Sequence, residues 1–229
     1  YLGAAGAINI NIDYYGPLPR PIEMNVRTWF LMQQIQFRLC ESNFFVGGRY
    51  VLSPTSNTFK LPIDIPEFSG IKVETTLSGV SAVFVYDSRN NVISPTQGIW
   101  AQTSPLSSDT WLGGDSRYGK INASFIGLQT LQQKWVLGGK IIANSKLGDI
   151  PFYIKPIIQM RGVPAMKYQD NNVVSIEGEV DWNLYKRWHL IGFAGFGSAF
   201  DKYNNMNDAN NVVSGGGGFR YLLARKFGM

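Results

Sequence analysis

The sequence predicts an all-β protein, specifically an antiparallel transmembrane β-barrel with about ten strands present. First, apolar and polar residues alternate with a period of two along much of the chain, which is typical of strands with one buried face. Second, the connections between these runs alternate between short and long. Third, 16% of the residues are charged, against about 25% in soluble proteins, while 14% are aromatic and 25 are glycine. These features indicate a sheet that meets lipid on one face and water on the other.

The expected strands lie near residues 4–14, 26–40, 44–53, 71–86, 97–105, 117–128, 134–144, 173–184, 188–199 and 212–224. The eighth of them shows the alternation best, since Val174, Ile176 and Val180 fall on one face while Glu177 and Glu179 fall on the other. Most of the segments reach the roughly 9–11 residues that a tilted strand needs to cross a bilayer.

The connections have a regular asymmetry. Long loops rich in Asn, Gly, Pro and Ser are expected at residues 15–25, 54–70, 106–116, 145–172 and 200–211, and short turns at 41–43, 128–133 and 185–187. Bacterial outer-membrane barrels have short periplasmic turns and longer extracellular loops. The pattern therefore favours that class over a soluble sandwich.

The polarity of the two faces predicts which one points outward. With this many strands the lumen is too wide for side chains to fill. Charged residues such as Lys120, Lys140 and Glu177 are therefore expected inside a wet lumen, with the apolar face toward lipid. An aromatic girdle is expected near the strand ends, from Trp100, Trp135, Trp182, Trp188, Tyr50 and Tyr221.

Other classes of function find little support in the composition. The chain has no run of about eighteen apolar residues, so no transmembrane helix is expected. Its net charge of +5 comes without a basic cluster interleaved with aromatic residues, so we expect no nucleic-acid partner. Cys40 is the only cysteine and His189 the only histidine. We therefore expect no disulfide within the chain, no metal site, no cofactor and no enzymatic activity.

The chain begins at Tyr1 without a visible signal peptide, which predicts a processed or truncated piece. An open sheet with lipid-facing edges is not viable in a membrane, so we expect a portion of a larger barrel. Residues 225–229 read as the start of a further strand. Residues 1–229 are therefore interpreted as one outer-membrane β-barrel domain, truncated at both ends.

Several motifs occur in the order of a known family. "YDSRNNVISPTQG" resembles the mid-barrel turn of the BamA/TamA outer-membrane assembly and translocation family (bacterial surface antigen family). "MRGVP" is similar to that family's Arg-Gly-aromatic motif, in its longest, inward-folded loop. "EGEVDWNL", "LIGFAGFGSAF" and "SGGGGFRY" resemble the three strands that follow. The resemblance spans about Gly79 to Met229, and its turn motif falls on Asp87, Arg89, Asn90, Pro95 and Gly98.

The resemblance implies a sixteen-strand barrel in which these segments are strands five to fourteen. It also implies that the loop motif Arg161, Gly162 and Val163 is held inside the lumen by Glu179 or Glu177. The chain departs from the family at Val163, usually aromatic, and at Gly195, usually aspartate. Physics alone leaves open an exposed arginine whose ion pair is worth about 0–1 kcal/mol.

For function, the resemblance implies insertion and assembly, or translocation, of proteins at the bacterial outer membrane. The implied partners are the outer-membrane bilayer with its lipopolysaccharide, client outer-membrane or secreted proteins, and periplasmic accessory proteins. Two alternatives stay open from the residues themselves. The barrel is either an anchor for a fused periplasmic or surface domain, or a passive pore.

Overall fold

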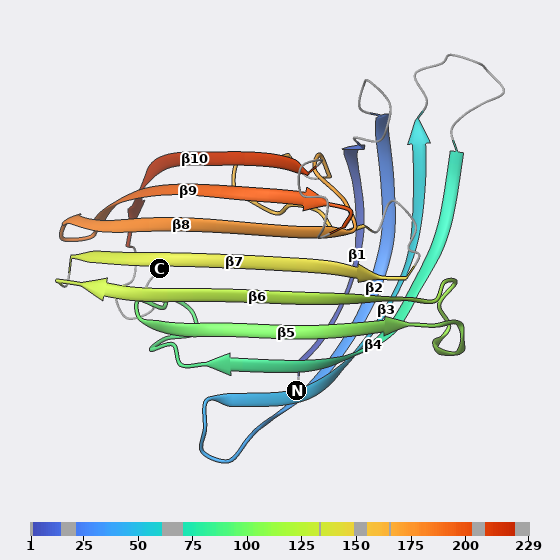
Figure 1. Ribbon diagram of the computed structural model, residues 1–229, viewed down its shortest axis with the longest axis horizontal. Helices are drawn as coiled ribbons and strands as arrows, with labels where there is room; N and C mark the ends of the chain where they lie inside the picture. The colour runs from blue at the N-terminus through green and yellow to red at the C-terminus, as the bar shows by residue number, and fades with distance from the viewer. Residues whose placement is uncertain are drawn as a thin grey trace.

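The computed structural model describes residues 2–14, 22–60, 71–132, 134–148, 155–164, 166–202 and 209–222, which form one antiparallel sheet (Figure 1). Its strands pair in chain order: β1 (Leu2–Tyr14), β2 (Ile22–Arg38), β3 (Phe44–Lys60), β4 (Ile71–Asp87), β5 (Gly98–Ser108), β6 (Tyr118–Leu131), β7 (Trp135–Leu147), β8 (Asn172–Tyr185), β9 (Trp188–Phe200) and β10 (Asn210–Tyr221). A short 3-10 helix, η1 (Thr110–Leu112), follows β5. Within the described ranges, no helix has the length and apolar character to span a membrane.

All ten predicted strands are present, but those of the first half are longer than expected. The predicted loops 15–25 and 54–70 are wrong at residues 22–25 and 54–60, which belong to β2 and β3. Pro54 and its polar neighbours read as loop from sequence alone. They nevertheless pair with β4, where Pro54 lies opposite Thr76, because cross-strand partners determine a strand more than local composition does.

The sheet is curved and open. In Figure 1, β5 to β10 run side by side across the view while β1 to β4 bend upward, so that the sheet forms a section of a barrel wall. In the described part of the chain, β1 and β10 are the two edges, each paired on one side only. The further strand predicted at residues 225–229 lies outside the described residues.

The convex, outer face is apolar and uncovered. One row of paired residues crosses eight strands, from Phe44 through Tyr86, Ala101, Phe125, Ile141, Ile176 and Phe196 to Val213. Ile176 and Phe196, in the middle of the sheet, are 49% and 48% exposed. Exposed apolar area costs about 25 cal/mol per Å² in water, so this face requires an apolar surrounding.

The outer face changes character toward the long-loop end of β2. The outward positions in the half nearer the short turn are apolar except for one glutamine, and hold Trp29, Leu31, Gln33, Ile35 and Phe37. Outward positions between residues 23 and 27 are polar and hold Glu23, Asn25 and Arg27. The neighbouring strands follow the same change, with Ser56, Thr58 and Lys60 beside these polar residues. Here the apolar side chains turn inward.

Two pairs of aromatic residues stand at the short-turn end of the outer face. Trp135 stacks on Trp182 with ring centroids 4.9 Å apart, and Trp188 meets Tyr221 at 4.9 Å. Two other expected members of the girdle lie elsewhere. Trp100 shares the inner face with its partner Ile126, which lines a lumenal cavity. Tyr50 lies in mid-strand, because β3 runs on to Lys60.

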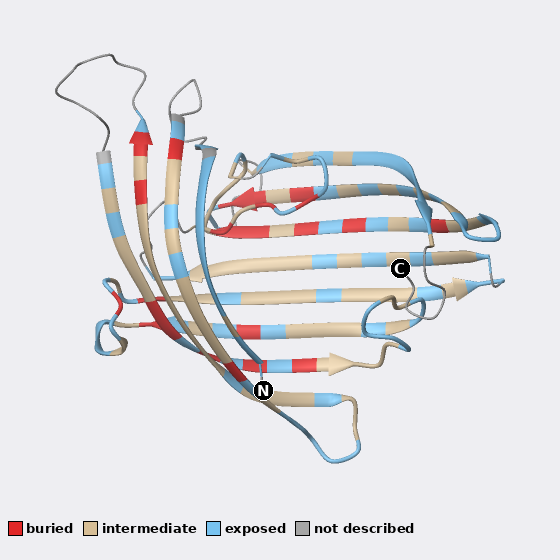
Figure 2. Cartoon of the chain, turned by 180° about the vertical axis from the view of Figure 1, so that it is seen from behind, coloured by how far each residue is buried: buried red, intermediate tan, exposed pale blue. Residues whose placement is uncertain are grey.

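The long connection between β7 and β8 crosses the inner face. At one end, Ile158 and Met160 are buried against Val173 of β8 and Ala199 of β9. At the other end, Met166 packs on a buried cluster formed by residues of β2 and β3, Met24 and Phe59. Figure 2 shows buried positions on β8, on β4 and near the long-loop ends of β2 and β3. This connection, the lumenal loop (residues 155–164 and 166–171), therefore joins two distant parts of the wall from inside.

Candidate functional site

The lumenal loop approaches the wall closely because the wall has no side chains where the two touch. A Cβ on Gly195 would lie 2.9 Å from Met160 Cε, and a Cβ on Gly197 would lie 2.8 Å from both Met160 Sδ and Ile158 Cγ2. The loop itself turns at Gly162, whose φ of 77° favours glycine, and the Val163 N–H closes the turn on the Met160 carbonyl at 3.3 Å.

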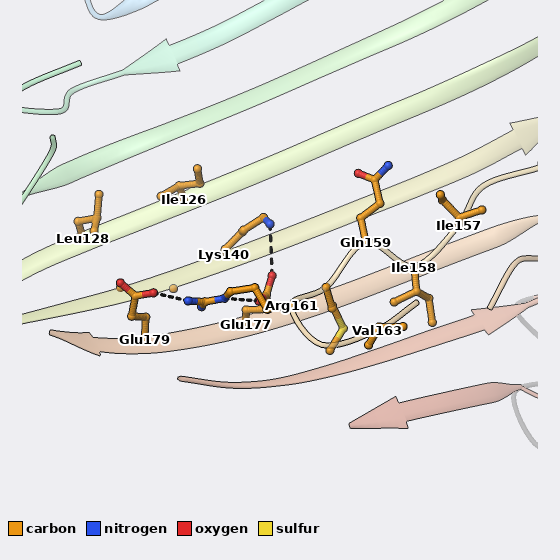
Figure 3. A pocket seen from close by; sticks show the side chains of 13 residues that line it. Ile126, Leu128, Lys140, Ile157, Ile158, Gln159, Arg161, Val163, Glu177 and Glu179 are labelled. Carbon is orange, nitrogen blue, oxygen red and sulfur yellow. Dashed lines mark hydrogen bonds and ion pairs between the residues drawn. The ribbon is translucent and has the colours of Figure 1, made fainter. Parts of the chain in front are cut away.

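Arg161 extends from this turn along the inner wall and contacts two carboxylates of β8 (Figure 3). Its Nε donates to Glu177 Oε2 at 3.0 Å and its Nη1 to Glu179 Oε2 at 2.5 Å. The guanidinium lies 3.9 Å from the ring centroid of Phe193 on β9. Glu177 also accepts from Lys140 Nζ at 3.2 Å and is 5% exposed. The structure thus brings together Arg161 and both predicted carboxylates.

The charge state of Arg161 follows from these contacts. Burial by itself lowers the pKa of the guanidinium, but hydrogen bonds to Glu177 and Glu179 outweigh it and raise the pKa above its ordinary value. Arg161 is therefore a permanent cation, and Glu177 and Glu179 face a fixed positive charge.

The ion pairs continue beyond Glu179 toward the short-turn end. Arg220 of β10 lies between two carboxylates, with Nη2 3.7 Å from Glu179 Oε1 and Nη1 2.8 Å from Asp181 Oδ2. Asp181 also lies 2.6 Å from His189 Nδ1. The alternating positions of β8 thus supply a row of carboxylates with cationic partners from β7, the loop and β10. We call this row, Glu177, Glu179 and Asp181 with their partners, the ion-pair ladder.

The residues of the predicted turn motif hold the connection between β4 and β5 in place through side-chain hydrogen bonds. Arg89 binds Asp87 through two hydrogen bonds, Nε to Oδ1 at 2.8 Å and Nη2 to Oδ2 at 2.7 Å, and the bonds to this carboxylate raise the pKa of Arg89. The side-chain oxygen of Asn90 accepts from the Thr96 and Gln97 N–H groups. Gly98 has a φ of 109°, and a Cβ there would stand 2.4 Å from the Ser88 carbonyl oxygen.

The turn and the ladder meet at a shared cavity, which the sequence did not predict. This cavity, of about 660 Å³, has Asn90 and Pro95 on one side and Asp181, His189 and Arg220 on the other. A second cavity, of about 600 Å³, lies between the lumenal loop and the wall and is lined by Ile126, Leu128, Lys140, Gln159, Met160 and Arg161 (Figure 3).

Sequence reasoning missed Phe193, Arg220 and Met160 as parts of the site. Phe193 supplies the aromatic contact that Val163 lacks. Phe193 lies two positions before Gly195 on the same face of β9. The alternation along that strand could therefore have identified it as a residue of the inner face. Arg220 and Met160 become part of the site only through pairing and packing between distant segments.

The single histidine, His189, forms neither a metal cluster nor a Ser-His pair with Ser198 among the described residues. Across the ranges that the structure describes, no group of three or more His, Cys, Asp and Glu side chains is placed to hold a metal ion. His189 and Ser198 stand on opposite faces of β9, since one position is odd and the other even along an unbroken strand.

No family model matches the chain, and no curated protein matches it. Among solved structures, it is similar to the crystal structure of BamA from Haemophilus ducreyi lacking POTRA domains 1–3, with a TM-score of 0.64 and 15% sequence identity. The match covers 96% of this chain and 52% of that one, so the chain spans about half the length of that structure. At the level of fold the resemblance is confirmed: the ten antiparallel strands form part of a BamA-like β-barrel.

Proposed function

We propose that this chain is part of a bacterial outer-membrane β-barrel that acts in insertion and assembly, or translocation, of other proteins. The observation that carries the proposal is Arg161, held by Glu177 and Glu179 at the centre of a loop that crosses the lumen. The BamA-like fold and the apolar outer face support the setting in a membrane. The fold likeness alone does not assign this activity.

The proposed work is non-covalent and uses no cofactor. A client strand adds to an exposed sheet edge through main-chain hydrogen bonds, which is ordinary β-augmentation. The lumenal loop packs on β8 and β9 at one end and near Met24 and Phe59 at the other. Its position therefore controls how the two halves of the wall move relative to each other. The proposed partners are the outer-membrane bilayer with its lipopolysaccharide, client proteins and periplasmic accessory proteins.

The activity is tested with the whole protein that contains this chain, reconstituted in vesicles. We expect it to accelerate the folding of an unfolded outer-membrane barrel, compared with empty vesicles. Arg161→Ala is expected to slow this folding about tenfold, which corresponds to roughly 1.4 kcal/mol of lost stabilisation. The readout is the fraction of client that resists denaturation in an unheated gel.

Arg117→Ala is the matched control, since the Arg117 side chain is 86% exposed and lies 3.3 Å from Asp109 outside the lumen. A client that folds equally fast in empty vesicles overturns the proposal. Equal client-folding rates for the wild type and Arg161→Ala would show that the lumenal loop does not contribute to the activity.

The membrane setting gives a separate prediction. The whole protein in detergent is expected to migrate differently in gels when heated and unheated, because a closed barrel resists detergent until it is heated. A protein that stays in solution without detergent contradicts the apolar outer face as a lipid-contacting surface.

A passive pore is the second candidate, favoured by the charged inner wall. It predicts ion conductance across planar bilayers without any effect on client folding. Conductance that Arg161→Ala leaves unchanged supports the pore, because the loop then does not occlude the lumen.

A further inference from the structure

One row of paired residues on the inner wall carries three cations and lies apart from the ion-pair ladder. The strand registers align Gln34 of β2, Arg49 of β3, Ser81 of β4, Leu106 of β5, Lys120 of β6 and Lys146 of β7. The row lies on the inner face, because Lys146 has the same parity as Lys140 along the unbroken strand β7. Lys120 and Lys146 stand directly opposite each other, which places their Cβ atoms about 4.5–5.5 Å apart.

Unlike Lys140, Arg161 and Arg220, these three cations have no carboxylate partner in the described part of the chain. Arg89, Lys140, Arg161 and Arg220 each pair with an aspartate or glutamate. Over the residues that the structure describes, no ion pair joins Lys120, Lys146 or Arg49 to an acid, and the side chain of Arg49 binds Gln34 Oε1 at 2.6 Å instead. Like charges directly opposite on a sheet are destabilising, so this part of the wall gains stability when an anion binds.

The surroundings of the two lysines supply neutral donors as well as charge. The next paired row on the same face aligns Ser104, Asn122 and Asn144, and Ser104 is 2% exposed. Hydroxyl and amide groups beside two ammonium groups suit the oxygens of a phosphate. Arg49 adds a guanidinium whose fork matches a second phosphate, about three strand spacings, or roughly 14 Å, from Lys120 at the backbone.

We propose that this row, the cationic row (Arg49, Lys120 and Lys146), binds a soluble ligand with more than one phosphate group. The Lys120 and Lys146 ammonium groups hold one phosphate, and Arg49 binds the second when its guanidinium turns from Gln34 on β2 toward Lys120. The row is separate from the site where Arg161 meets Glu177 and Lys140. Lys146 and Lys140 are six residues apart on β7, which is about 20 Å along the strand. The row also faces away from the apolar outer surface, which sets it apart from phosphates of lipids in the surrounding bilayer.

The experiment uses the whole protein in detergent with inorganic pyrophosphate as the probe. Calorimetric titration is expected to show binding to the wild type, and pyrophosphate is expected to raise the midpoint of thermal unfolding. The double variant Lys120→Gln/Lys146→Gln is expected to bind at least about tenfold more weakly, and Lys120→Arg/Lys146→Arg to retain binding, since the charge is kept. Without ligand, the glutamine variant should unfold at the same temperature as the wild type or higher.

Lys134→Gln is the matched control, because Lys134 is an exposed lysine in the turn between the same two strands, at their other end. It is expected to bind pyrophosphate like the wild type. The proposal is overturned when the wild type shows no binding, or when the double glutamine variant binds as tightly as the wild type. An oligoglutamate peptide that binds as tightly as pyrophosphate overturns the phosphate class and identifies the row as a surface for acidic segments. Lipopolysaccharide that competes with pyrophosphate overturns the assignment to a soluble ligand.

Discussion

Arg161→Ala is expected to release the lumenal loop from the wall, at a cost of about 2 kcal/mol in the free energy of loop opening. Removing one partner of a buried ion pair costs about 3–5 kcal/mol and an exposed pair about 0–1 kcal/mol. Arg161 stands between these cases, since its own side chain is 43% exposed while Glu177 is 5% exposed. Lys140 remains beside Glu177 and reduces the loss.

A double-mutant cycle distinguishes this tether from two independent contributions. Arg161→Ala, Glu179→Ala and their combination are compared by hydrogen exchange of the loop amides in detergent. We expect the double variant to lose less than the sum of the singles, with a coupling of about 1 kcal/mol or more. Additive effects within about 0.5 kcal/mol contradict the pairing. Arg117→Ala again serves as the exposed control.

Gly195→Asp is expected to push the loop away, although the resemblance to BamA/TamA proteins implies an aspartate at this position. The new Cβ would meet Met160 Cε at 2.9 Å and Glu177 Cγ at 3.0 Å. Overpacking of this kind costs about 1–3 kcal/mol, and a further negative charge beside Glu177 adds repulsion. The expected result is faster hydrogen exchange in the loop.

Met160→Ala supplies the decisive second variant. Combined with Gly195→Asp it removes the contact with Met160 Cε but leaves the one with Glu177 Cγ, so loop protection should return part of the way toward the wild-type level. Gly218→Asp is the matched control, since a Cβ on Gly218 meets nothing within 4 Å. Unchanged loop exchange in Gly195→Asp would show that Met160 moves aside freely and that its packing does not position the loop.

Alternation along the chain was sufficient to predict the ten strands and the faces of Glu177 and Glu179. The period of two assigns a face to each residue without knowledge of its neighbours. The strand prediction failed where pairing with neighbouring strands, rather than local sequence, determines the strand boundary. Residues 55–60 are polar except for Phe59 and follow Pro54, yet they belong to β3 because β2 and β4 pair with them.

The loop tether was foreseen only through a motif, and its surroundings were not. The contact of Arg161 with Phe193 depends on the register between β8 and β9 and on the path of the loop. The packing of Met166 on Met24 joins residues that are remote in sequence, and no local pattern specifies it. The resemblance implies an aspartate where this chain has Gly195, and in the structure the glycine makes room for Met160.

The outward residues of β2 change from apolar to polar, and the length of the apolar part determines the hydrocarbon thickness that the wall matches. From Trp29 to Phe37 there are eight residue steps (37 − 29), about 27 Å along the strand at about 3.4 Å each, or about 21 Å along the membrane normal at a tilt of about 40°. A thicker bilayer would draw Arg27 into the edge of the hydrocarbon, where a lipid-facing cation costs about 0–1 kcal/mol, rising toward about 2–4 kcal/mol at greater depth. A thin membrane is therefore the one that this wall fits without distortion, and a thicker one must thin locally around β1 to β4.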